Sequence, residues 1–195
     1  HTHPNVVICF RSSDMVLKLH SDASYLTASE HDNELEDTFS LVAYQEGKLI
    51  KLNGNIYVTY AILKLVAASA AEAELGALFI NAREAAYIRK ILIEMGHPQP
   101  RTPLQTDNST AEGVVNKNVQ TKKLKSMDMR FHWLRDRESQ GQFRIFWRPG
   151  KANRADYWSK TQHPPSHHAD MRRQILTPLK ILLELRKKYR PARVC

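Results

Sequence analysis

Hydrophobic and polar positions alternate in short runs through the first third of the chain, which is typical of half-buried strands. Residues 15–19 alternate and run into His20-Ser21-Asp22, which predicts a strand that finishes at a carboxylate. Residues 39–44 and 49–60 predict further strands, and the acidic residues 29–37 are expected to form a loop.

From residue 67 the apolar spacing becomes helical, and strands then alternate with helices. We expect, in chain order, a helix at 67–95 stopped by Gly96-His97-Pro98, a strand at 102–106, a helix opening at 107–109, a helix near 127–138, a strand at 142–147 and a short helix from 156. Ser109 and Glu112 have the spacing of a capping box. A strand meander followed by this alternation predicts an α/β fold, with helices packed on a mixed sheet.

Composition narrows the class of protein. The 195 residues are 42% hydrophobic and 25% charged, enough for one domain with tails. The formal net charge of +9 favours a polyanionic partner, although a basic surface can also serve solubility.

The two cysteines, Cys9 and Cys195, do not have the spacing of metal ligands. No apolar run approaches the ~18 residues of a membrane span, and because residue 1 is His we expect the chain to begin inside a longer product.

Three acidic residues occupy expected strand ends or helix starts: Asp22, Asp107 and Asp156. Strand ends are where ligands gather in an open α/β sheet. Carboxylates that converge there repel one another unless a cation neutralises them, and hard oxygen ligands select Mg²⁺ or Mn²⁺. Taken singly, each aspartate has a plainer interpretation as a helix cap or a turn residue.

Helix geometry separates Glu74 from its neighbour Glu72. At ~100° per residue, Glu74 shares a stripe with Leu78, whereas Glu72 shares one with Arg83 and Lys90. We therefore expect Glu72 to be solvated and Glu74 to point toward the core. An unpaired carboxylate there is costly, which a metal partner would offset. The alternative is that Glu74 lies on the border of the apolar sector and reaches water.

Four motifs resemble the ribonuclease H domain of copia-type retrotransposon polyproteins. They are HSDASY (20–25), SAAEAELGAL (69–78), QTDNSTA (105–111) and WRPGKANRADYWSK (147–160). Residues 127–143 also resemble the family's penultimate helix and following strand, so the resemblance runs from about residue 12 to about residue 168.

The resemblance implies a ribonuclease H-like fold, a five-stranded mixed sheet flanked by helices. It implies hydrolysis of the RNA strand of RNA–DNA hybrids during retroelement reverse transcription, with two Mg²⁺ ions, or Mn²⁺ in their place. The family's metal-binding carboxylates fall on Asp22, Glu74, Asp107 and Asp156.

The resemblance also suggests an organisation and partners. Residues 1–11 are an upstream connection, 12–162 the ribonuclease H-like domain, and 163–195 a linker and basic tail. The expected partners are an RNA–DNA hybrid and the upstream reverse transcriptase domain of the same polyprotein, without a membrane. The expected location is a cytoplasmic retroelement particle, or the nucleus.

Two features depart from the family pattern. The loop at 149–153 lacks the histidine that many ribonucleases H carry there, and acidic residues 34–37 replace a glycine-rich lead-in. A drifted domain that binds hybrid without cutting it is therefore one alternative. Another nuclease of the superfamily, such as an integrase or resolvase, is a second one, although the ADYWSK ending fits ribonuclease H better.

Polar and basic residues near these motifs are candidate contacts for nucleic acid: Ser24, Asn108, Ser109, Lys122, Lys123, Lys125 and Lys151. Arg130, Arg135 and Arg137 extend the basic region, and a solvated helix face is the plainer interpretation of each. For three other groups of residues, the plainer structural interpretation is preferred. We expect Trp133 and Trp147 to pack in the core, the histidines of 163–168 to lie in a polar linker, and the tail at 179–193 to be basic and amphipathic.

Overall fold

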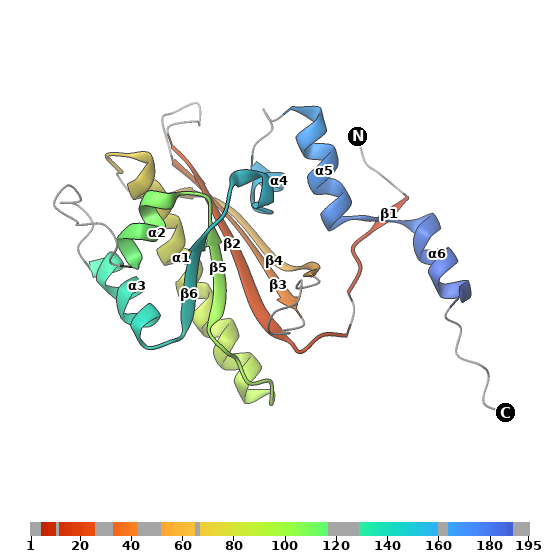
Figure 1. The fold of residues 1–195 in the computed structure, drawn as a ribbon, viewed down its shortest axis with the longest axis horizontal. Helices are drawn as coiled ribbons and strands as arrows, with labels where there is room; N and C mark the ends of the chain where they lie inside the picture. Colours follow the sequence, from red (N-terminus) through yellow and green to blue (C-terminus); the bar gives the residue numbers. More distant parts are fainter. Residues whose placement is uncertain are drawn as a thin grey trace.

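The computed structural model in Figure 1 describes residues 5–10, 12–25, 33–42, 52–64, 67–116, 129–159 and 164–188. Its elements are β1 (Val6–Val7), β2 (Val16–Ser24), β3 (Asn33–Val42), β4 (Leu52–Leu63), α1 (Ala70–Glu94), β5 (Thr102–Thr106), α2 (Ser109–Val115), α3 (Met129–Ser139), β6 (Phe143–Trp147), the 3₁₀ turn η1 (Gly150–Ala152), α4 (Asp156–Ser159), α5 (Pro165–Ile175), β7 (Thr177–Pro178) and α6 (Leu179–Lys188).

The described strands β2 to β6 form one five-stranded sheet in the order β4-β3-β2-β5-β6. The meander β2-β3-β4 is antiparallel, whereas β5 runs parallel to both β2 and β6. Parallel neighbours need a crossover, and helices supply it here. The α/β class and the mixed sheet expected from the sequence are confirmed.

One face of the sheet carries α1, α2 and α3, while α4 and α5 lie on the other side (Figure 1). Leucines of β2 and α1 fill the first interface, and Leu17, Leu19, Leu75 and Leu78 are fully buried. Each such side chain contributes roughly 1.5–3 kcal/mol when it is removed from water. This packing fixes α1 across the ends of β2 and β5.

The start of α1 corrects the expectation for Glu72. Ser69 caps the helix by accepting the Glu72 amide, and Glu72 Oε2 accepts the Ala68 amide at 2.7 Å. The side chain folds back over the helix start and is buried instead of solvated, because these amides have no partner within the helix.

Two further expectations about local structure are wrong. Residues 33–37 begin β3, because β2 and β4 pair with them on both sides, which outweighs their poor strand propensity. The cap of α2 is Asn108, whose Oδ1 accepts the Ala111 amide at 3.0 Å, and not Ser109. Asn108 takes this role because it stands one residue nearer the strand end, where the backbone is still extended.

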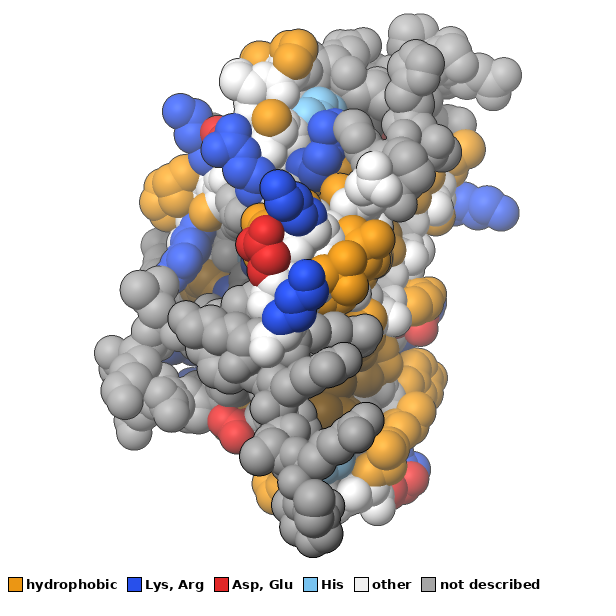
Figure 2. All heavy atoms as spheres, turned by 90° about the vertical axis from the view of Figure 1, so that its right-hand side faces the viewer, with side chains coloured by type: hydrophobic (Ala, Val, Ile, Leu, Met, Phe, Trp, Pro, Cys, Tyr) orange, Lys and Arg blue, Asp and Glu red, His pale blue; other side chains and the backbone are white. Residues whose placement is uncertain are grey.

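The described part of 163–195 is largely helical, and α5 begins within the stretch 163–168 that we expected to be a linker. Met171 and Ile175 of α5 are buried, and β7 pairs with β1, which joins the two ends of the chain. Figure 2 views the molecule from this side and shows Lys and Arg side chains beside hydrophobic ones. On α6, Ile181 and Leu183 are about half exposed. Among the described helices we find none with the length and apolar character to cross a membrane.

Candidate metal centre

Three aspartates from three elements converge at one edge of the sheet. Asp22 lies in β2, Asp107 directly follows β5, and Asp156 is the first residue of α4. One carboxylate oxygen of each lies within 4.8 Å of the other two. Because β2 and β5 are parallel neighbours, their carboxyl ends meet at the same edge. Asp22 and Asp156 are almost fully buried, so their charges act in a medium of low dielectric.

Glu74 reaches the same edge from α1. Its Oε1 accepts the Ala23 amide at 3.0 Å, and its Oε2 accepts the Thr106 hydroxyl at 3.2 Å. Burial raises the pKa of Glu74 well above its usual value, and the charges of Asp22 and Asp107 raise it further. Glu74 therefore points inward, as the helix stripe predicted, and lies next to the three-aspartate group.

The loop before Asp156 is pressed against the sheet. Gln105 Nε2 donates to the Ala152 carbonyl at 3.0 Å, and Asn153 Nδ2 donates to the Ser21 carbonyl at 2.8 Å. A Cβ placed on Gly150 would lie 2.9 Å from Asp107 Oδ2. The absence of a side chain at Gly150 therefore leaves room for the carboxylate of Asp107.

Trp147 corrects another expectation. It is 46% exposed, and its Nε1 donates to the Asp107 carbonyl at 2.8 Å. Its place at the end of the edge strand β6 leaves the ring at the rim, where it holds the backbone of Asp107. Trp133, by contrast, packs against the core, edge-on to Phe79 with ring centroids 5.4 Å apart, as expected.

A row of basic residues lies on the same face of β2 as Asp22. Burial lowers the pKa of Lys18 to about 8, and burial followed by the charges of Lys18 and Arg154 lowers the pKa of His20 well below its usual value. His20 Nδ1 accepts the Arg154 amide at 3.4 Å. Sequence reasoning missed this row, although the period-two pattern puts residues 18, 20 and 22 on one face.

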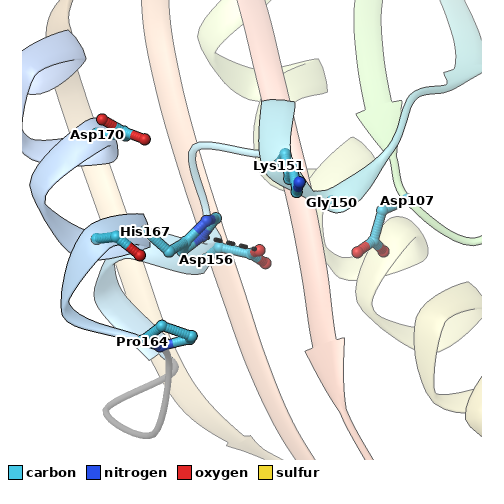
Figure 3. A pocket seen from close by; sticks show the side chains of 8 residues that line it. Asp107, Gly150, Lys151, Asp156, Pro164, His167 and Asp170 are labelled. Carbon is cyan, nitrogen blue, oxygen red and sulfur yellow. Dashed lines mark ion pairs between the residues drawn. The ribbon is translucent and has the colours of Figure 1, made fainter.

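The residues that the sequence proposed as nucleic-acid contacts differ in their exposure and in the hydrogen bonds that they already make. Lys151 is exposed and lines a cavity of about 540 Å³ with Asp107 and Asp156 (Figure 3). Ser24 already donates to Glu34 Oε2 at 3.1 Å. Asn108 caps α2, and Ser109 is exposed at its start. The remaining three, Lys122, Lys123 and Lys125, lie outside the described residues.

Two of the arginines on α3 have structural contacts. Arg135 donates to the Val114 carbonyl through Nε and Nη2, at 3.1 and 2.7 Å, and its guanidinium lies 4.1 Å from the centre of the Phe131 ring. Arg137 lies over Trp133 at 5.1 Å. These contacts favour helix packing over phosphate binding for both arginines.

His167 is a site residue that the sequence did not reveal. It lies on α5, lines the same cavity, and places Nε2 3.7 Å from Asp156 Oδ2. Sequence reasoning put it in a linker beyond the domain, because only the docking of α5 brings it back to Asp156.

No family model matches the chain. The chain is 26% identical over 153 residues to the retrovirus-related Pol polyprotein from transposon TNT 1-94 of Nicotiana tabacum. The match covers 78% of this chain and 11% of the polyprotein, so the chain spans about a tenth of that relative's length.

Among solved structures, the fold is similar to LC11-RNase H1, isolated from compost by a metagenomic approach. The TM-score is 0.52 at 12% identity, over 73% of this chain and 91% of that one. An N-terminal RNase H domain from Mycobacterium tuberculosis gives a TM-score of 0.44 at 10% identity, over 82% of this chain and 97% of that one. The chain thus has the ribonuclease H fold, and it resembles the ribonuclease H domain of a retrotransposon Pol polyprotein.

Proposed function

We propose that the chain is a metal-dependent ribonuclease H of a retroelement polyprotein, which hydrolyses the RNA strand of RNA–DNA hybrids. The observation that carries the proposal is the convergence of Asp22, Asp107 and Asp156 within 4.8 Å, with Glu74 buried beside them. Such a group of carboxyl groups is stable only with protons or cations between them. Burial raises the pKa of Glu74 most, and the charges of Asp22 and Asp107 add to that cost.

The donor set fits hard divalent cations. Asp22, Glu74, Asp107 and Asp156 would hold two Mg²⁺ ions, or Mn²⁺, through carboxylate oxygens. When bound, such ions activate a water and stabilise the leaving oxygen of a phosphodiester. The amide of Ala23 and the hydroxyl of Thr106 orient the carboxylate of Glu74, and the indole of Trp147 holds the backbone carbonyl of Asp107. Lys151 at the mouth of the cavity is placed to attract the phosphate.

The proposed setting is reverse transcription. The partners would be the hybrid and a reverse transcriptase domain upstream in the same polyprotein, within a cytoplasmic retroelement particle or the nucleus. The formal net charge of +9 supports a nucleic-acid partner, because clustered cations bind phosphates and release counterions.

A cleavage assay tests the proposal. The chain is incubated with an RNA–DNA hybrid labelled on the RNA, in Mg²⁺ and in EDTA, with duplex RNA and duplex DNA as comparison substrates. We expect Mg²⁺-dependent cutting of the RNA in the hybrid alone, and none by Asp22→Asn. Cutting that persists in EDTA or in the variant would contradict the assignment. A fusion to the upstream polymerase domain is the second arm, in case the isolated chain binds hybrid weakly.

A domain that binds hybrid without cutting it is the second candidate. Glu34 favours a drifted domain, because it belongs to the acidic residues that replace the family's glycine-rich lead-in and it lies beside Ser24 at the end of β2. Tyr60 and Ser24 donate to it, which holds the negative charge in place. Binding of the hybrid without cleavage, in Mg²⁺ and in both arms of the assay, would favour this candidate.

A further inference from the structure

His167 is held at the metal centre by the first turn of α5. The amides of His167 and His168 both donate to the Pro164 carbonyl, at 2.9 and 3.3 Å. Pro165 opens the helix, and the buried Met171 and Ile175 attach it to the domain. The backbone of His167 is therefore fixed by helix geometry and by packing.

The imidazole of His167 lies against one side of Asp156. The side chain is 16% exposed, and Nε2 is 3.7 Å from Asp156 Oδ2. Figure 3 shows the carboxylate of Asp156 between His167 and Asp107. His167 is absent from the group of ligand atoms that lie within 4.8 Å of one another. In the view of Figure 3, the imidazole lies on the side of Asp156 away from Asp107.

This arrangement is that of an outer partner to a metal ligand. Carboxylates that bind metals are usually hydrogen-bonded by such a partner, which fixes the direction of the oxygen that faces the ion. The 3.7 Å separation is longer than a hydrogen bond, and a bridging water or a small rotation of the ring would complete the contact.

We propose that His167 is a positioning residue of the metal centre, whose Nε2–H orients the carboxylate of Asp156 toward the cation. The inference rests on the proposed function, because it takes the aspartates to bind divalent cations. Under this proposal α5 contributes to the metal centre, although the helix follows Asp156, the last of the four candidate metal ligands, in the sequence.

The neighbouring His168 offers a matched control. Its ring packs edge-on to Tyr157, with centroids 5.9 Å apart, and it does not line the cavity. His167→Phe keeps a ring but removes the donor, His167→Ala removes both, and His167→Gln keeps a donor. His168→Phe changes a ring of the same kind one residue away.

The experiment measures binding of MnCl₂ alone to the full chain by titration calorimetry, without nucleic acid, and circular dichroism checks the fold of each variant. We expect His167→Phe and His167→Ala to weaken Mn²⁺ binding by about tenfold, as is usual for outer partners. His167→Gln should keep most of the affinity, and His168→Phe should match the wild type. If His167→Phe or His167→Ala folds and binds Mn²⁺ with the affinity of the wild type, the proposal is overturned.

Cleavage of the hybrid supplies a second readout. A positioning role predicts that His167→Phe recovers kcat at saturating Mn²⁺ with the KM for hybrid unchanged. A raised KM with an unchanged Mn²⁺ isotherm would mean that His167 contacts the nucleic acid, which overturns the proposal. If the variants weaken Mn²⁺ binding as expected but the wild type cuts no hybrid, the proposed function fails and the positioning role stands. A wild type that binds no Mn²⁺ refutes both.

Discussion

The charge of Asp22 should destabilise the fold when no cation is present. Its carboxylate oxygen lies within 4.8 Å of those of Asp107 and Asp156. At that distance each pair of full charges repels by roughly 3 kcal/mol at an effective dielectric of about 20. Buried carboxyl groups take up protons, which lowers this repulsion. The raised pKa of Glu74 is part of that response.

Asp22→Asn removes the charge and keeps the shape. We expect a net gain of about 2 kcal/mol in metal-free buffer, after the cost of placing a new amide in a buried site. For a chain of this size, that gain corresponds to a rise in Tm of roughly 4–8 °C. Mg²⁺ should raise the Tm of the wild type by neutralising the cluster, and should have little effect on the variant.

The assay is thermal unfolding followed by circular dichroism, in EDTA and in 10-fold steps of Mg²⁺. Asp136→Asn is the control, because this exposed aspartate on α3 accepts a hydrogen bond from Gln140 and lies outside the cluster. A Tm in EDTA that falls for Asp22→Asn, together with an equal response of both proteins to Mg²⁺, would refute the repulsion argument.

Three further predictions concern the metal centre and the basic region. Because the folded pKa of Glu74 is raised, the folded state binds more protons, so the metal-free protein should lose stability as pH rises above the ordinary value of 4.5 and through the raised pKa. Urea unfolding at a series of pH values measures this loss, which Glu74→Gln should abolish; a loss that persists in the variant argues for another group. Gly150→Ala should leave the fold intact but push aside the carboxylate of Asp107 and weaken Mg²⁺ binding by about tenfold, measured by calorimetry; unchanged affinity would show that the loop simply shifts. Replacing Lys122, Lys123 and Lys125 by Ala should lower the slope of log affinity for hybrid against log salt by roughly one for each lost phosphate contact, and equal slopes would mean that these lysines are only solvated.

The local pattern of the sequence determined the main elements and the inward direction of Glu74. Alternation over 15–19 and helical spacing from 67 are consequences of side-chain periodicity, which depends only on neighbouring residues. The strand over 102–106 has the expected bounds, and the long helix ends where Gly96 adopts a positive φ of 89°. The same pattern put Asp22 and Asp107 at strand ends and Asp156 at a helix start.

Only the tertiary structure decided which distant residues meet. The acidic residues 33–37 became a strand because two neighbouring strands supply their hydrogen bonds, which no local propensity encodes. Trp147 lies at the rim because β6 is an edge strand, a fact of sheet order. His167 reaches Asp156 because α5 docks through Met171 and Ile175. In each case the deciding free energy comes from burial and pairing between segments far apart in the chain, and these contacts exist only once the whole domain is folded.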